Sequence, residues 1–267
     1  MADGAEAGQY PLPFRGGGFV AQQRRGAALM AFTVLLIAWE IAVRWRWVSP
    51  IFLPSPSSVL AALYDLAERG TLWIHLAQSV RRLLAGWVLG TVVGLGVGFS
   101  MGVWSLARAI GAPAVSALFP IPKIALLPLF ILWFGIGETS KVVTIALGAF
   151  FPTVIATYSG VDGVARTLIR MAQSFNLPWR AIVLKIVFPG AWPNILAGMR
   201  ISASIALILL VSAEMIGAQY GIGAFILSAG NLMQTDQLLA GVVILSILGL
   251  LVGTGLGYLE RSLLRWR

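Results

Sequence analysis

The sequence of 267 residues contains no cysteine and only one histidine, His75. The lack of cysteine excludes a disulfide framework, thiol catalysis and a cysteine-ligated metal. A single histidine leaves no cluster for a metal or for a Ser/His catalytic site. A phosphate loop of the form G-x-x-x-x-G-K-[ST] is also missing. We therefore expect no cofactor, no metal and no enzymatic activity in this chain.

Charged residues are scarce as well. They make up 11% of the chain, against about a quarter in a soluble domain, while 58% of the residues are hydrophobic and the mean hydropathy is +0.88. The apolar runs are roughly 20 residues long and do not alternate with polar residues, which favours helices over a barrel. The sequence therefore predicts an all-α polytopic membrane protein with lipid as its surroundings. Basic residues collect in the cytoplasmic loops of membrane proteins, which explains the net charge of +9. No nucleic-acid partner is therefore expected.

Six hydrophobic runs predict six membrane spans in a single transmembrane domain over residues 27–267. The spans cover residues 27–43, 83–104, 113–137, 140–158, 195–217 and 238–258. Residues 1–26 are polar and Gly-rich, without a cleavage signal, and are expected to be a disordered cytoplasmic segment.

Basic residues predict the orientation of the chain. Six spans place both termini on one side, together with most of the basic residues: Arg15, Arg24, Arg25, Arg108, Arg166, Arg170, Arg180, Lys185, Arg261, Arg265 and Arg267. That side of the multi-pass membrane protein is expected to be the cytoplasm. Arg44, Arg46, Arg81 and Arg82 fall on the other side and count against this orientation.

The second and third predicted spans have unusual residues. Gly86, Gly90, Gly94, Gly98 and Gly102 recur every fourth residue, a stripe that lets another helix approach closely. The third span is interrupted by prolines and contains a lysine. Because broken backbone is tolerated at membrane depth only against protein or a water-filled cavity, this span is expected to face the interior.

Charged residues inside membrane spans are functional hypotheses by default. Lys123 and Glu214 are therefore candidates for a translocation pathway, with Pro122 and Pro128 beside Lys123. A structural role for Lys123, near the end of a shorter helix, is an equal alternative. Glu214 cannot pair with Arg200 in its own helix because the two lie about 21 Å apart. Glu40 and Arg44 have the spacing of a local ion pair.

Residues 160–193 predict a basic hairpin of two amphipathic helices. Leu168, Met171, Ala172 and Phe175 share one helical face, and Trp179, Ile182, Val183 and Ile186 share another. Asn176 suits the left-handed end of the first helix, and Pro178 suits the first turn of the second. Pro189 and Pro193 are expected to end this element before the fifth span. Either helix alone would be a surface helix, but two helices with a fixed break indicate a stiff loop that a partner can grip.

The segment RMAQSFN, followed nine residues later by IVFP, resembles the EAA loop of ABC importer permeases. The segments FLPSPSSVL, PIPKIALLPLFILWFGIGETSK, ALGAFFP, LAGMRISASIALILLVSAEMIGAQYGIGAFI and LERSLLRW also resemble the branch that imports nitrate, sulfonates and taurine. The resemblance covers residues 27–267. This chain departs from the family pattern in four places, where Arg170 replaces a Glu, Met171 an Ala, Asn176 a Gly and Phe188 a Leu.

The resemblance implies a permease subunit of an ABC importer for a small anionic or polar solute. The hairpin would be the coupling helix that docks on a cytoplasmic ATP-binding subunit, through Arg170, Met171, Ala172, Asn176, Ile186 and Pro189. The implied assembly lies in a bacterial inner (plasma) membrane and holds two permease subunits, expected to be identical, two ATP-binding subunits and a periplasmic solute-binding protein. The alternatives are a stand-alone secondary transporter, which should show matching broken helices in two halves, and an intramembrane enzyme, for which the spans lack paired carboxylates.

Overall fold

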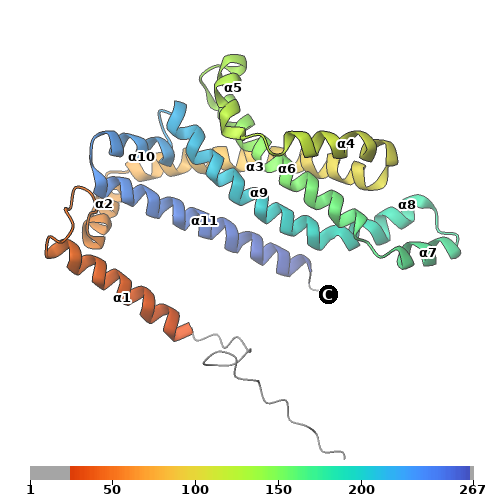
Figure 1. Ribbon diagram of the computed structural model, residues 1–267, viewed down its shortest axis with the longest axis horizontal. Helices are drawn as coiled ribbons and strands as arrows, with labels where there is room; N and C mark the ends of the chain where they lie inside the picture. The colour runs from red at the N-terminus through yellow and green to blue at the C-terminus, as the bar shows by residue number, and fades with distance from the viewer. Residues whose placement is uncertain (1–24, 265–267) are drawn as a thin grey trace, which may run out of the picture. The chain divides into compact units, whose positions relative to one another are not determined.

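The computed structural model describes residues 25–264, so most of the predicted disordered segment, with Arg15 and Arg24, lies outside the described residues, as do Arg265 and Arg267. The described residues form helices and no strand, which confirms the all-α fold. In chain order the helices are α1 (Arg25–Arg44), α2 (Pro56–Glu68), α3 (Thr71–Val103), α4 (Ser105–Leu118), η1 (Lys123–Leu126), α5 (Leu127–Phe134), α6 (Glu138–Asp162), α7 (Arg166–Ser174), α8 (Trp179–Ile182), η2 (Val183–Val187), α9 (Phe188–Gly217), α10 (Ile222–Asn231) and α11 (Thr235–Leu263) (Figure 1).

The chain up to Ser57 and the chain from Ser58 are two compact units. In the first unit, α1 covers the first predicted span. The predicted pair forms near its end, with Arg44 Nε 2.6 Å from Glu40 Oε1. The same carboxylate accepts hydrogen bonds from the backbone nitrogen and the hydroxyl of Ser57, at 3.1 and 2.8 Å.

The second unit is a helical bundle in which α6 packs between α3 and α9. Four of its helical segments are long and apolar enough to cross a membrane: α3, α6, the run from α8 to α9, and α11. The pair of α4 with η1 and α5 makes a fifth if it is counted as one bent span. The count of six spans stays a prediction.

The glycine stripe of α3 lies against α6, as the sequence predicts. A Cβ added at Gly90 would collide with the backbone of Ala146, and one at Gly86 would meet the side chain of Ile145. Farther along, Gly98 faces Val154 in the same way. The two helices therefore touch backbone to backbone, a contact that only a residue without a side chain permits.

The proline-rich third span is bent, also as predicted. The part before the break, α4, and the part after it, η1 with α5, meet at 89°. Pro122 directly precedes η1, and Pro128 stands in the first turn of α5. The N–H groups of the first helical turn have no partner within the helix, so the N–H that proline lacks is not missed there. Pro128 is therefore compatible with the start of α5 and does not break the helix.

Candidate functional site

The hairpin predicted from residues 160–193 forms a helix–turn–helix. α7 ends at a left-handed Asn176, with φ of 55°. The backbone nitrogens of Asn176 and Leu177 donate to the carbonyls of Gln173 and Ala172, at 2.9 and 3.1 Å, which closes the helix end. Pro178 stands directly before α8. The turn chemistry inferred for Asn176 is therefore confirmed.

The hairpin buries less of its apolar surface than its helical periodicity suggests. Ala172 is 3% exposed and lies in a cluster with Val161, Val164, Ile182, Val187, Ala191 and Ile195. Met171 on α7 and Phe175, which directly follows the last residue of α7, remain 56% and 74% exposed. Leu168 is exposed too, so α7 is anchored by Ala172, with Ile169 half-buried against the same cluster. It presents an exposed apolar face, which we call the α7 apolar face (Leu168, Met171, Phe175). Of the other predicted coupling residues, Arg170 and Asn176 are exposed, and Ile186 and Pro189 are half-buried.

The expectation that Pro189 and Pro193 end the second helix is wrong. Residues Trp179–Gly217 form one uninterrupted helical run of 39 residues. A π-helical turn, Val183–Val187, directly precedes the Phe188–Pro189 pair. A π-turn displaces the i→i−4 hydrogen-bond ladder, so the missing N–H of Pro189 falls where the ladder is already interrupted. The hairpin therefore continues directly into the fifth predicted span.

Two side-chain contacts tie the bundle to the hairpin region. The rings of Trp104 and Trp179 stack with centroids 6.4 Å apart and 26° between their planes. Arg108 on α4 makes a two-pronged ion pair with Asp162 at the end of α6, at 3.0 and 3.3 Å. A cavity of about 280 Å³ lies beside these contacts, lined by residues that include Asp162, Gln173 and Trp179.

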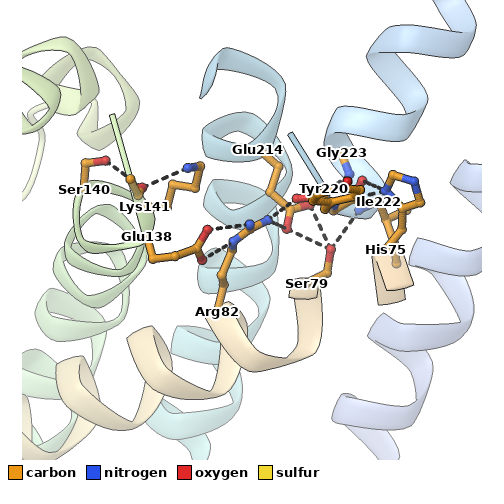
Figure 2. Close-up of polar contacts among 12 residues, drawn as sticks. His75, Ser79, Arg82, Glu138, Ser140, Lys141, Glu214, Tyr220, Ile222 and Gly223 are labelled. Atoms are coloured by element: carbon orange, nitrogen blue, oxygen red, sulfur yellow. Dashed lines mark hydrogen bonds and ion pairs between the residues drawn. The ribbon is translucent and has the colours of Figure 1, made fainter. Parts of the chain in front are cut away.

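A cluster of charged residues, in which Arg82 and Glu214 are buried and Glu138 is exposed, occupies the other ends of α6 and α9 (Figure 2). At its centre is Arg82 of α3, which is 3% exposed. Its Nε and Nη2 donate to the Glu138 carboxylate at 2.6 and 2.7 Å, and its Nη1 donates to Glu214 at 2.8 Å. The carbonyl of Tyr220 accepts a further hydrogen bond from Nη1. Since α6 has 25 residues, about 37 Å of helix separates this cluster from the hairpin.

The Glu214 carboxylate is completely buried and fully hydrogen-bonded. It accepts hydrogen bonds from the hydroxyl of Ser79 at 2.8 Å and from the backbone nitrogen of Gly223 at 2.9 Å, in addition to that from Arg82. Ser79 in turn accepts from the backbone nitrogen of Ile222 at 2.8 Å. The carboxylate thus lies at the N-terminus of α10, where a negative charge is favourable. This arrangement joins α3, α9 and α10.

Arg82 is not among the site residues that the sequence predicts. Beside Arg81 it resembles the positively charged edge of a span expected to start at residue 83. The structure begins α3 at Thr71, so Arg82 lies well inside the helix. The one available signal was the presence of Glu214 in a later span, an intramembrane carboxylate that requires a cationic partner.

The other predicted pathway residues lie apart from the charge cluster. The ammonium of Lys123 donates to the carbonyls of Leu118 and Phe119 at the end of α4. It also lies 4.5 Å from the ring centroid of Phe151. No carboxylate in the described part of the chain pairs with it. The predicted pathway residues Lys123 and Glu214 are therefore held by different partners.

Comparison with known proteins identifies the family. Residues 90–265 match the family described as "Binding-protein-dependent transport system inner membrane component". The chain is 38% identical over 238 residues to the taurine transport system permease protein TauC of Escherichia coli (strain K12), covering 87% of this chain and 86% of that protein. It is 37% identical to the putative aliphatic sulfonates transport permease protein SsuC of Bacillus subtilis (strain 168), covering 90% and 87%.

Solved structures agree on the fold. An inward-facing structure of the MetNI methionine ABC transporter matches with a TM-score of 0.59 and 22% identity, over 70% of this chain and 93% of that chain. An amino acid ABC transporter crystallised with histidines matches with a TM-score of 0.57 and 15% identity, over 75% and 97%. This multi-pass membrane protein belongs to the inner-membrane permease family of binding-protein-dependent ABC transporters.

Proposed function

We propose that the chain is the permease subunit of an ATP-driven importer for small organic sulfonates of the taurine type. The support is the identity of more than a third with two permeases named for taurine and aliphatic sulfonates, over most of each chain. The alternative of a stand-alone secondary transporter has no comparable support. In this account the solute reaches the permease from a periplasmic solute-binding protein, and ATP hydrolysis belongs to a separate ATP-binding subunit.

We propose further that the hairpin is the docking element for that ATP-binding subunit. The observation that carries this proposal is the α7 apolar face, which is exposed although the helix is anchored at Ala172. Exposed apolar side chains near the centre of a patch are typical anchors of a protein interface. Arg170 lies beside Met171 in the chain and would meet the partner with a charge opposite to the Glu of the family pattern. Asn176 holds the turn, while Ile186 and Pro189 join the hairpin to the long helix.

The hairpin is stiff enough to transmit movement. It runs without a break into α9, and Trp104 and Asp162 hold its base. A rigid-body shift imposed on α7 and α8 by closure of the ATP-binding subunits would therefore reach the far end of α9. In the assembly that we propose, two copies of this chain face two ATP-binding subunits, and the hairpin and both termini lie in the cytoplasm.

The route of the solute is also a proposal. Lys123 lies at the 89° bend and has no carboxylate partner in the described residues, so it can offer a positive charge to a passing sulfonate. Pro122 and Pro128 shape the backbone on either side of it. Glu214 would not contact the solute, since its carboxylate oxygens already accept hydrogen bonds from within the chain. Its contribution would be to join α3, α9 and α10 at the end of the bundle opposite the hairpin.

Uptake of radiolabelled taurine tests the proposed function. The chain would be expressed with the ATP-binding and solute-binding proteins encoded beside it, in cells without their own taurine and sulfonate importers. We expect uptake that requires all three proteins and that unlabelled alkanesulfonates inhibit. Uptake that persists without the ATP-binding subunit and collapses with the ion gradient would favour the secondary transporter instead.

A further inference from the structure

Arg82 has two carboxylate partners, and their surroundings differ sharply. Glu214 is 0% exposed, and its carboxylate also accepts hydrogen bonds from Ser79 and from the backbone of Gly223. To separate Glu214 from Arg82 would leave a charge buried without compensation, which is among the costliest changes in a protein interior. A Cβ at Gly221 would also collide with the Glu214 carboxylate and the Arg82 guanidinium, so the loop before α10 closes over this ion pair. This side of Arg82 is therefore fixed.

The Glu138 side is different. The Glu138 side chain is 53% exposed, and Arg82 is its only hydrogen-bond partner among the described residues. If Glu138 turns away, water can hydrate its carboxylate while Glu214 still compensates the charge of the buried Arg82, so release costs less here than on the Glu214 side. Figure 2 shows the two sides of Arg82, with Glu138 reaching it from α6 and Glu214 from α9.

Glu138 also stands at a structurally sensitive point, the first residue of α6. It follows the Gly135–Gly137 turn, in which Gly135 has a φ of 81°. The side chains of Ser140 and Lys141 both donate to the carbonyl of Gly137, at 3.1 and 2.8 Å. The Arg82–Glu138 pair thus fastens to α3 the turn that carries α5.

We propose that Arg82 is a positioning residue with one fixed side and one releasable side. Glu214, Ser79 and α10 stay attached to α3, whereas Glu138 leaves Arg82 when the turn between α5 and α6 moves during transport. Only the timing within transport rests on the proposed function. The difference between the two sides of Arg82 can be tested in the permease by itself.

The absence of native cysteine makes the test direct, because a single introduced thiol gives no background. Ser140→Cys places it beside the releasable turn, at a side chain that is 1% exposed. Thr144→Cys is the matched control one helical turn farther along α6, where the side chain is 0% exposed. Each would be combined with native Glu138 or with Glu138→Gln, which keeps the size of the side chain and removes its charge.

The readout is the rate of reaction with a charged, water-soluble methanethiosulfonate reagent in detergent micelles. We expect Glu138→Gln to raise the rate about 1.5- to fivefold at position 140, which is the range for loss of a half-exposed ion pair, and to leave position 144 unchanged. Equal rates at position 140 would overturn the proposal. A rise at both positions would overturn it too, because it would mean that all of α6 had loosened.

A second measurement places the release in the transport cycle. In the complex with the ATP-binding subunit, the rate at position 140 with native Glu138 should change about 1.5- to fivefold between ADP and ATP, again the range for a half-exposed ion pair. An active transporter without this nucleotide dependence would contradict release during transport. If no complex forms and no uptake occurs, the proposed function has failed, while the comparison in micelles still decides whether Glu138 is the releasable partner.

Discussion

The backbone contact between α3 and α6 allows a worked prediction for Gly90→Ala. The added Cβ would overlap the carbonyl oxygen of Ala146 and lie 2.9 and 3.0 Å from its carbonyl carbon and Cα. None of these atoms can move alone, since all belong to the α6 backbone. The helices must therefore separate by about 1 Å along the stripe.

The magnitude follows from dispersion. Two atoms in contact gain roughly 0.1–0.2 kcal/mol of dispersion energy, and a gap of about 0.5–1 Å between them removes about a quarter to a half of it. Over the tens of atom pairs in such an interface, the loss amounts to about 1–3 kcal/mol, the usual range for overpacking. Alanine also gains about 1 kcal/mol of helix propensity over glycine, which would hide part of the loss.

Gly96→Ala removes this ambiguity. Gly96 lies in the same helix, and a Cβ there meets no atom within 4 Å. Both variants gain the same propensity, so their difference isolates the packing loss of about 1–3 kcal/mol. Unfolding in mixed micelles with increasing sodium dodecyl sulfate, followed by the fluorescence of the ten tryptophans, measures it. Equal stability of the two variants would refute the contact between α3 and α6.

Three other substitutions test the charge cluster and the bend. Arg82→Leu should destabilise the protein by about 3–5 kcal/mol because it strands a buried carboxylate, whereas Arg69→Leu, which removes an exposed pair, should cost less than about 1 kcal/mol; similar losses would mean that the cluster is hydrated. Gly221→Ala should lower the midpoint of the same unfolding titration more than Gly70→Ala, since both have positive φ but only Gly221 lacks room for a Cβ; equal midpoints would argue against the closed loop. Lys123→Gln should reduce taurine uptake about tenfold, the value of one charge-assisted hydrogen bond, while the ATP-binding subunit still co-purifies; unchanged uptake would remove Lys123 from the route of the solute.

The features that the sequence predicts well are those with a local physical cause. Gly86 to Gly102 recur with the helical repeat, so their common face could be identified without knowing that α6 covers it. Pro122 and Pro128 predicted the break of the third span, because proline restricts the backbone wherever it stands. Asn176 predicted the turn of the hairpin, because asparagine readily adopts the left-handed conformation that ends a helix.

The features that the sequence hid depend on distant partners. Arg82 is stabilised by Glu138 and Glu214, which lie 56 and 132 residues farther along the chain. When these partners are unknown, an arginine is interpreted as the end of a membrane span. The span was therefore predicted to start at residue 83, although α3 begins at Thr71. Pro189 led to the wrong prediction of a helix end, because the π-turn that accommodates this proline leaves no recognisable pattern in the sequence. The exposure of Met171 and Phe175 could not be predicted either, since periodicity locates an apolar face but does not say what covers it.

The role proposed for the hairpin is docking on the ATP-binding subunit. It is tested most directly by co-purification in detergent of that subunit with three forms of the permease: the native chain, Met171→Glu with Phe175→Glu, and Gln173→Glu. Both replaced residues of the double variant are exposed, so its fold should persist, as gel filtration would verify. Gln173 is also exposed but lies on another side of α7, so its variant adds the same charge away from the α7 apolar face. We predict that the ATP-binding subunit is retained by the native chain and by Gln173→Glu, and lost from the folded double variant. Retention by all three would contradict this role.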